Sequence, residues 1–302
     1  MGELTRMEIL RTVDDLRGWS RAARAESGNI VGLVPTMGAL HAGHASLIRA
    51  ARAACMHVGV SLFVNPTQFG PGEDYARYPR SFEADCALAE AEGADVLFAP
   101  SVEELYPNGP VSMFVDVPDL SGRLDGASRP GHFRGVTTVV AKLLIAAEPD
   151  RAFFGQKDAA QVAVVRRMVA DLGLATEIVA CPIVRDADGL ALSSRNAYLS
   201  PAERAQALTL SRAVRHVESL VAGGERRGPV LIEAAHGDFA DARSAFGLAR
   251  SALGSESEVR IDYIALVDWA TLEPVEIAVP GTLFAVAAYV GTTRLIDNAI
   301  LK

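Results

Sequence analysis

The stretch from Val31 to Leu47 reads V-G-L-V-P-T-M-G-A-L-H-A-G-H-A-S-L and contains the clearest structural signal in the chain. Ile30 to Val34 is apolar and bounded by turn formers, which is typical of a fully buried strand. Pro35 and Gly38 end that strand. From Gly43 on, apolar residues recur at helical spacing, at Leu47, Ile48, Ala51 and Ala54, which predicts a helix that starts near His44. The stretch therefore predicts a strand, a loop and a helix in succession.

The start of this predicted helix is suited to an anion. Exposed backbone N–H groups and the positive end of the helix dipole attract negative charge, commonly a phosphate. His41 and His44 lie there as H-A-G-H, and each imidazole can donate a hydrogen bond to a phosphate oxygen. Gly43 between them lets a ligand approach the backbone. In the alternative interpretation, one histidine caps the helix and the other is a surface residue, but the position between strand and helix favours a ligand site.

Composition restricts the class of protein. The chain has 302 residues, of which half are hydrophobic and 22% are charged, so it can bury a sizeable core in one large domain or two unequal ones. The net charge of −8 argues against a nucleic-acid partner. Three scattered cysteines, a charged N-terminus without the apolar region of a signal peptide, and no long apolar run predict a cytoplasmic protein without a membrane span.

Strand and helix patterns alternate through the first part of the chain. The predicted helices are 12–25, 82–91, 136–147 and 160–172, and the further strands are 58–64, 96–99, 151–154 and 177–180. This order indicates an α/β fold with a doubly wound parallel sheet. From Pro201 on, two helices reaching about Ala222 and Leu253 precede strands at 259–266 and 283–290, which indicates a smaller α+β domain. We place the domains at 1–182 and 183–302.

Polar residues that follow the predicted strands are further site candidates, because open α/β sheets bind ligands there. Asn65 and Gln68 follow one strand, although Gln68 also fits an ordinary turn residue satisfied by water. Lys157 in G-Q-K-D follows another, with Asp158 as the predicted N-cap of the next helix and Gln161 one turn into it. An ammonium group beside a helix N-terminus suits a polyphosphate.

The segment Gly122–Val136 contains three arginines, one histidine and four glycines. It is predicted to be either a mobile, anion-facing loop or a solvated loop whose arginines pair with acidic residues. Further on, a polar crossing segment contains Ser193, Ser194 and Arg195. Two histidines, a lysine, an arginine and hydroxyls at one sheet edge can clamp a triphosphate and stabilise charge at an α-phosphate under attack. An attacking carboxylate would then give an acyl adenylate and pyrophosphate.

Seven motifs follow one another along nearly the whole chain: V-P-T-M-G-A-L-H-A-G-H, F-V-N-P-T-Q-F, Y-P-R-S-F-E-A-D-C, R-P-G-H-F-R-G-V, F-F-G-Q-K-D, L-A-L-S-S-R-N-A-Y-L and T-R-L-I-D-N. On these motifs the chain resembles the pantothenate synthetase (pantoate–β-alanine ligase) family. The resemblance implies a ligase that forms an amide bond. ATP and pantoate give pantoyl adenylate and pyrophosphate with Mg²⁺ assisting, and β-alanine then displaces AMP to give pantothenate. It also implies a Rossmann-like first domain, a C-terminal domain that lids the site, and a homodimer.

Site residues follow from the same resemblance. His44 would be the proton donor, acting with His41, Lys157 and Arg195 as the catalytic set. Gln68 would contact pantoate and the path of β-alanine, Gln161 would hold pantoate, and Asn65 would belong to the same substrate site. The implied ATP-binding residues are Met37, Gly38, Ala39, Leu40, His41, Ala42, Gly43, His44, Gly155, Gln156, Lys157, Asp158, Val184, Leu192, Ser193, Ser194 and Arg195.

Two positions depart from the family pattern. Gln156 stands where family members usually have Glu, and Ala84 removes a possible second carboxylate beside Asp85. We therefore assign no protein ligands to Mg²⁺, which often binds phosphates with few protein ligands. Two other functions share parts of these motifs: an adenylyltransferase with a phosphate acceptor, and a non-catalytic nucleotide sensor. The first does not require Gln68 and Gln161 to hold a hydroxy acid, and the second does not require the catalytic set.

Overall fold

The computed structural model describes residues 7–25, 28–109, 111–253 and 259–302. Residues 1–6, in the N-terminus for which no signal peptide is predicted, lie outside the described residues, as does Pro110. The chain forms two compact units. The first contains Met1–Gln156 and Gln161–Pro182, and the second contains Lys157–Ala160 and Ile183–Lys302.

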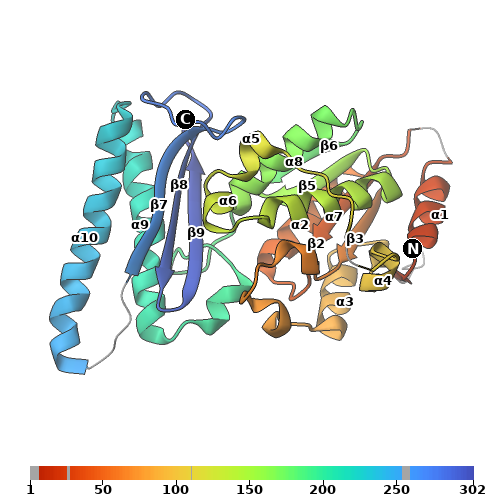
Figure 1. Cartoon of the computed structure of the whole chain (residues 1–302), viewed down its shortest axis with the longest axis horizontal. Coiled ribbons are helices and arrows are strands. Elements are labelled where there is room, and N and C mark those ends of the chain that lie inside the picture. The colour runs from red at the N-terminus through yellow and green to blue at the C-terminus, as the bar shows by residue number, and fades with distance from the viewer. Residues whose placement is uncertain (1–6, 26–27, 110, 254–258) are drawn as a thin grey trace. The chain divides into compact units, whose positions relative to one another are not determined.

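The first unit is built on a parallel sheet. Among the described residues it has six strands in the order β1-β4-β3-β2-β5-β6, and every neighbouring pair is parallel. The strands are β1 (Glu8–Leu10), β2 (Val31–Thr36), β3 (His57–Leu62), β4 (Val96–Phe98), β5 (Arg151–Gly155) and β6 (Glu177–Cys181). The predicted doubly wound sheet is confirmed (Figure 1). β1 is an edge strand that was not predicted from the sequence.

The order of the strands places a topological switch beside β2. From β2 the chain runs outward through β3 to β4, then returns to the other side of β2 to form β5 and β6. Ligands of open α/β sheets bind outside the carboxyl ends of the strands at such a point. The segments that begin there are the turn after β2 and the turn after β5.

Helices cover both faces of this sheet. On one face, Leu47, Ile48 and Ala51 pack in one buried cluster with residues of β2, β3 and β5. On the other face, Trp19 lies against Gly59, where an added Cβ would be 3.2 Å from its ring. The helical segments are α1 (Val13–Ala23), α2 (Ala42–Ala54), η1 (Pro66–Gln68), η2 (Asp74–Arg77), α3 (Phe82–Ala91), α4 (Val102–Leu105), α5 (Pro118–Ser121), α6 (Asp125–Ser128), α7 (His132–Ala147), η3 (Gln156–Asp158) and α8 (Ala159–Asp171).

The prediction of a loop over Gly122–Val136 is wrong for much of that segment. It contains α6 and the first turn of α7, which begins four residues earlier than expected. The four glycines of the segment suggested a loop, but two of them are needed where the backbone packs closely against neighbouring backbone. A Cβ at Gly126 would collide with the carbonyl oxygen of Ser121, and one at Gly135 would collide with that of Thr67.

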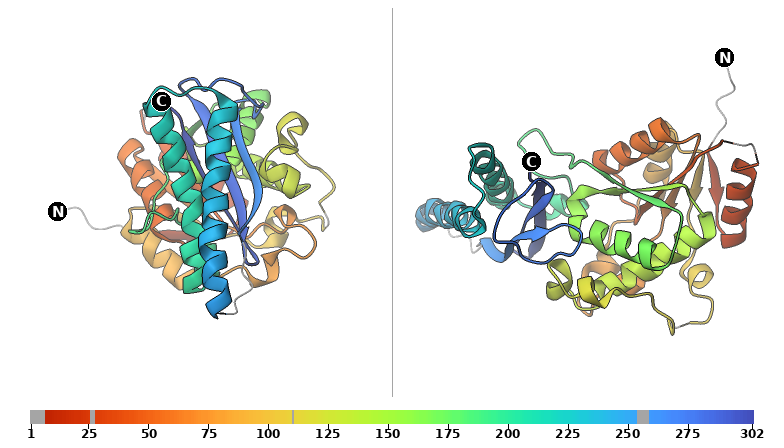
Figure 2. Two further views of the ribbon diagram at one scale, coloured as in Figure 1. Left: turned by 90° about the vertical axis from the view of Figure 1, so that its left-hand side faces the viewer. Right: turned by 90° about the horizontal axis from the view of Figure 1, so that it is seen from above.

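The second unit pairs two helices with an antiparallel sheet. Its elements are η4 (Ser194–Tyr198), α9 (Pro201–Ala222), α10 (Gly228–Leu253), β7 (Val259–Asp268), β8 (Thr282–Val290) and β9 (Thr293–Ile300). The left view of Figure 2 shows α9 and α10 side by side in front of the sheet. The predicted α+β character is confirmed, although β9 was missed in the sequence analysis.

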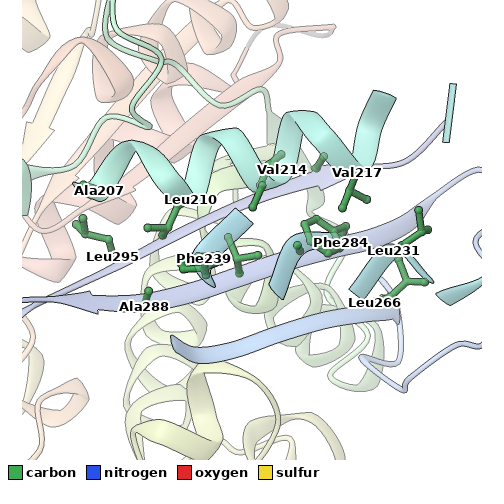
Figure 3. Close-up of a cluster of buried hydrophobic side chains, with 14 of the residues drawn as sticks. Ala207, Leu210, Val214, Val217, Leu231, Phe239, Leu266, Phe284, Ala288 and Leu295 are labelled. Atoms are coloured by element: carbon green, nitrogen blue, oxygen red, sulfur yellow. The ribbon is translucent and has the colours of Figure 1, made fainter. Parts of the chain in front are cut away.

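The core of this unit lies between the helices and the sheet. Leu210, Val214 and Val217 form one stripe of α9 and point toward Phe284 and its neighbours on the strands (Figure 3). Fully burying an aliphatic or aromatic side chain of this size contributes about 1.5–3 kcal/mol. The helix start at Pro201 was predictable because Ser200 and Glu203 form a capping box around a proline in the first turn.

Candidate active site

The turn between β2 and α2 has an unusual backbone. Gly38 and Ala39 both have positive φ angles, of 87° and 50°. For alanine this left-handed conformation is unfavourable, so neighbouring structure must hold it in place. The turn lies at the carboxyl end of β2 and leads directly into the two histidines.

Asp85 on α3 holds this turn. Its carboxylate is 1% exposed and accepts hydrogen bonds from the backbone N–H of Ala39 (2.9 Å) and of Leu40 (2.7 Å). The hydroxyl of Ser81 donates a third hydrogen bond, at 3.1 Å. A charged acceptor on two backbone donors is a strong and directional interaction. Asp85 therefore fixes the path of the chain into the H-A-G-H motif.

The two histidines cap α2 with their Nδ1 atoms. Nδ1 of His41 accepts from the N–H of Gly43 (3.1 Å), and Nδ1 of His44 accepts from the N–H of His41 (3.2 Å). In the neutral imidazole, the other ring nitrogen then carries the hydrogen. Capping and ligand binding are thus compatible, because capping uses Nδ1 and makes each Nε2–H a donor. The first turn of α2 contains no acidic residue that would oppose an anion.

Asn65 is the centre of a buried network beside this turn. Its side chain is 1% exposed, and its Nδ2 donates to Oε1 of Gln68 and to the carbonyl oxygen of Gly135, both at 3.1 Å. Its Oδ1 accepts from the hydroxyl of Tyr106 at 2.9 Å and from Thr67. Both donors of the Asn65 amide are therefore used within the protein. Asn65 fixes the orientation of Gln68.

Gln68 also contacts the turn between β2 and α2, residues 37–41, which we call the signature turn. Its Nε2 donates to the sulfur of Met37 at 3.0 Å, and a thioether is a weak acceptor. The structure therefore brings Met37, Asn65 and Gln68 together within the first unit. An oxygen of a hydroxy acid would be a better partner for this N–H than the Met37 sulfur.

An arginine–glutamate pair holds the backbone at Gln68. Arg129 makes two hydrogen bonds to Glu73, at 2.8 and 2.6 Å, and donates to the carbonyl oxygen of Gln68 at 3.3 Å. Burial raises the pKa of Glu73, but hydrogen bonds and charge from Arg129, with help from Gly70 and His132, lower it to about 2. Of the two interpretations of the Gly122–Val136 segment, the pairing of its arginines with acidic residues is confirmed for Arg129.

In the second unit, a hairpin presents the S-S-R segment. Leu192 donates from its N–H to the carbonyl oxygen of Val184 at 3.0 Å, and residues 186–189 form the turn. Ser193 follows at once, and its Oγ accepts from the N–H of Arg195 at 3.3 Å. Ser193, Ser194 and Arg195 are half-buried on or beside η4, so the hairpin holds these three candidates together.

The remaining candidates follow β5. Gly155 is the last residue of β5, and Gln156, Lys157 and Asp158 form η3, directly before α8. Gln161 is half-buried in the first turn of α8. Lys157 is half-buried, and its backbone carbonyl oxygen accepts a hydrogen bond from Asn298 at 2.9 Å. The N-cap role of Asp158 stays a prediction.

The described residues contain no group of three or more histidines, cysteines or acidic residues that could hold a metal ion. Both oxygens of Asp85 already accept hydrogen bonds, so this carboxylate does not fit a metal ligand. In the part of the chain that the structure describes, no helix is long and apolar enough to cross a membrane.

Comparison with known proteins identifies the family. The family model for pantoate–β-alanine ligase matches residues 8–300. This chain belongs to the pantoate–β-alanine ligase family. It is 59% identical over 271 residues to the pantothenate synthetase of Acidobacterium capsulatum, covering 90% of this chain and 86% of that one. The pantothenate synthetase of Koribacter versatilis is 51% identical, with 98% of this chain and 96% of that one covered.

Solved structures of the family share this fold. Pantothenate synthetase from Thermus thermophilus is 46% identical, with a TM-score of 0.81 and 97% and 99% of the two chains covered. Pantoate–β-alanine ligase from Francisella tularensis, complexed with beta-gamma ATP and β-alanine, is 30% identical, with a TM-score of 0.75 and 97% of both chains covered.

Three supporting interactions in this ligase-family chain were not predicted from the sequence. These are the hydrogen bonds of Asp85 to the signature turn, the hydrogen bond between Asn65 and Tyr106, and the ion pair between Arg129 and Glu73. An aspartate on the buried face of α3 was the available signal for the first. The other two join residues 41 and 56 positions apart, and no local pattern reports such a distance.

We predict that Asp85→Ala destabilises the first unit. The variant removes the buried carboxylate that accepts from two half-buried backbone N–H groups, which costs about 2–4 kcal/mol in the free energy of unfolding. Urea unfolding followed by circular dichroism measures this difference. The matched control is Glu83→Ala on the exposed side of the same helix, with an expected change under about 1 kcal/mol. Equal losses in the two variants would contradict the role given to Asp85.

A second prediction concerns pH. The pKa of Glu73 is lowered from 4.5 to about 2 in the folded protein, so the ionised carboxylate stabilises the fold. That contribution is complete above the unfolded value near 4.5 and is lost as the pH falls toward 2. The stability difference between the unsubstituted chain and Glu73→Gln should therefore shrink across this range. Unfolding curves recorded from pH 6 to about pH 2 test it, and a constant difference would rule it out.

Proposed function

We propose that this chain joins pantoate to β-alanine at the expense of ATP and forms pantothenate, AMP and pyrophosphate. The observation that carries the proposal is family membership over residues 8–300, together with the intact signature turn that leads into His41 and His44. The reaction is that of a ligase that forms an amide bond. It proceeds through pantoyl adenylate.

The first step needs charge stabilisation rather than a protein nucleophile. The carboxylate of pantoate attacks the α-phosphorus of ATP, and pyrophosphate leaves. We assign His41 and His44, with their Nε2–H donors, to the phosphates, and His44 to proton donation. The positive, N-terminal end of the α2 helix dipole stabilises the negative charge on these phosphates. In the second step the amine of β-alanine attacks the acyl carbon, loses a proton, and AMP leaves.

The second unit supplies the remaining phosphate ligands in this proposal. Lys157, Ser193, Ser194 and Arg195 provide an ammonium, two hydroxyls and a guanidinium, which together suit a polyphosphate. The other predicted ATP-binding residues contribute mainly backbone groups and shape. They are Met37, Gly38, Ala39, Leu40, Ala42, Gly43, Gly155, Gln156, Asp158, Val184 and Leu192.

Pantoate is assigned to the amides of Gln68 and Gln161. Nε2 of Gln68 donates to a weak sulfur acceptor in this structure, and a hydroxyl or carboxylate oxygen of pantoate offers a stronger one. Asn65 contributes to the same site by fixing the Gln68 amide. Gln68 also lies on the proposed path of β-alanine.

Mg²⁺ enters the proposal only as part of the ATP substrate. The described residues offer no cluster of metal ligands, and Asp85 is occupied by backbone N–H groups. Phosphate oxygens and water are sufficient ligands for this ion. We also propose, from the family resemblance, a cytoplasmic homodimer whose C-terminal unit lids the site.

Two other functions fit the chain less well. An adenylyltransferase with a phosphate acceptor does not require two glutamine amides directed at a hydroxy acid. A non-catalytic nucleotide sensor does not require His44, Lys157 and Arg195 together, yet all three are present. The match to the ligase family over nearly the whole chain favours the ligase.

We predict that His44→Ala and Lys157→Ala each fold normally and lose most adenylation. Removing a donor aimed at developing charge lowers the rate by about 10²–10³-fold. The assay is pantothenate and AMP formation from ATP, pantoate and β-alanine.

Matched controls are His236→Ala and Lys302→Ala, which remove the same side chains at exposed positions. Both should keep full activity. Near-normal turnover by His44→Ala or Lys157→Ala would disprove the role of that residue. Absence of pantothenate formation by the unsubstituted chain would disprove the proposed function itself.

A further inference from the structure

The closing motif T-R-L-I-D-N has no role in the proposed function. It occupies β9 from Thr293 to Asn298, and the last two residues carry polar side chains that are almost completely buried. Asp297 is 2% exposed and Asn298 is 3% exposed. Buried polar side chains are expensive unless they make specific hydrogen bonds, so their partners are informative.

Asn298 holds the backbone of a phosphate-ligand candidate. Its Nδ2 donates to the carbonyl oxygen of Lys157 at 2.9 Å, across 141 positions of sequence. A second long-range bond secures the same segment, because Nε1 of Trp269 donates to the carbonyl oxygen of Ala159 at 3.0 Å. The segment that carries the Lys157 ammonium is therefore anchored to the sheet of the second unit.

Asp297 holds the other phosphate-ligand segment. Its two carboxylate oxygens accept from Arg185 at 2.6 and 2.9 Å, which is the bidentate geometry of a strong arginine pair. Arg185 also donates to the carbonyl oxygen of Gly189, inside the same hairpin. Both ends of the guanidinium are thus engaged, so Arg185 acts as a tether rather than as a phosphate ligand.

The hairpin connects Arg185 rigidly to the serines that follow it. Asp186 donates from its N–H to the carbonyl oxygen of Leu190 at 2.8 Å, and Leu192 pairs with Val184. Ser193 is the next residue, and η4 follows without a linker. A shift of Arg185 would therefore move the S-S-R segment with it.

We propose that Asp297 and Asn298 are positioning residues that set the spacing between Lys157 and the Ser193–Arg195 segment, and so the fit of the second unit to the phosphates of ATP. The proposal rests on the phosphate-binding role assigned to Lys157 above. Neighbouring residues of a strand point to opposite faces, so one short piece of β9 anchors two segments on different sides of its sheet.

The chemistry offers a readout that separates positioning from general stability. The β- and γ-phosphates leave as pyrophosphate in the first step, so the second step, from pantoyl adenylate and β-alanine, no longer contains them. We measure KM for ATP, the adenylation rate, and the rate of aminolysis of supplied pantoyl adenylate. The variants are Asn298→Ala and Asp297→Asn, in the full chain.

The expected result is a split between the two steps. Loss of one such hydrogen bond should raise KM for ATP, or lower the adenylation rate, by about tenfold. Aminolysis of pantoyl adenylate should stay within about twofold. If Asn298→Ala does not fold, the near-isosteric Asn298→Leu replaces it, because it removes the donor and keeps the volume.

Matched controls are Asn108→Ala and Asp119→Asn, which make the same chemical changes at exposed positions. The inference would be overturned if Asn298→Ala and Asp297→Asn both leave KM for ATP and the adenylation rate unchanged while Lys157→Ala has lost adenylation. Equal losses in both steps, with a lowered melting temperature, would also overturn it and leave a purely structural role. If Lys157→Ala is itself active, the assigned role of Lys157 fails instead.

Discussion

The hydrogen bonds from Ala39 and Leu40 to the buried carboxylate of Asp85 are the constraint on which the first unit's site depends. The turn after β2 has two successive positive φ angles, and an alanine does not adopt one without support. With the turn held, α2 begins at a fixed point, and the backbone of His41 and Gly43 can bond to the imidazole Nδ1 atoms. In the neutral imidazole each Nε2 then carries the hydrogen. One acidic side chain thus holds the turn from which both imidazoles follow.

The two units fix the orientation of their candidate site side chains in different ways. In the first unit, a glutamine amide is fixed by Asn65, which is in turn fixed by Tyr106 and by the carbonyl oxygen of Gly135. In the second unit, the cationic and hydroxyl side chains are on short segments whose backbones are tied to β9. The chain as a whole is acidic, with a net charge of −8, so the proposed function relies on the local placement of a few cations and N–H donors to attract the phosphates. Buried, hydrogen-bonded polar groups make that placement rigid.

Most of the fold could be predicted from the sequence, because its signals are local. The helix α3 was predicted with its observed bounds, and α9 begins at Pro201 because a capping box surrounds that proline. The strands β1 and β9 were missed, since the first has three residues and the second has buried polar residues near its end. The glycines of Gly122–Val136 were interpreted as a loop, whereas Gly126 and Gly135 allow close packing. Site residues could be named from motifs, but Asp85, Tyr106, Arg185 and Asp297 act through contacts between distant positions, which only the folded chain displays.

In the proposed function, this chain activates a carboxylic acid as an acyl adenylate at the site that contains H-A-G-H. The most direct test is exchange of labelled pyrophosphate into ATP, with pantoate present and β-alanine withheld. Exchange that requires pantoate is expected, because adenylation is reversible before the amine acceptor arrives. Binding of ATP without any exchange would rule out pantoyl adenylate formation and would favour a nucleotide sensor or another acceptor acid.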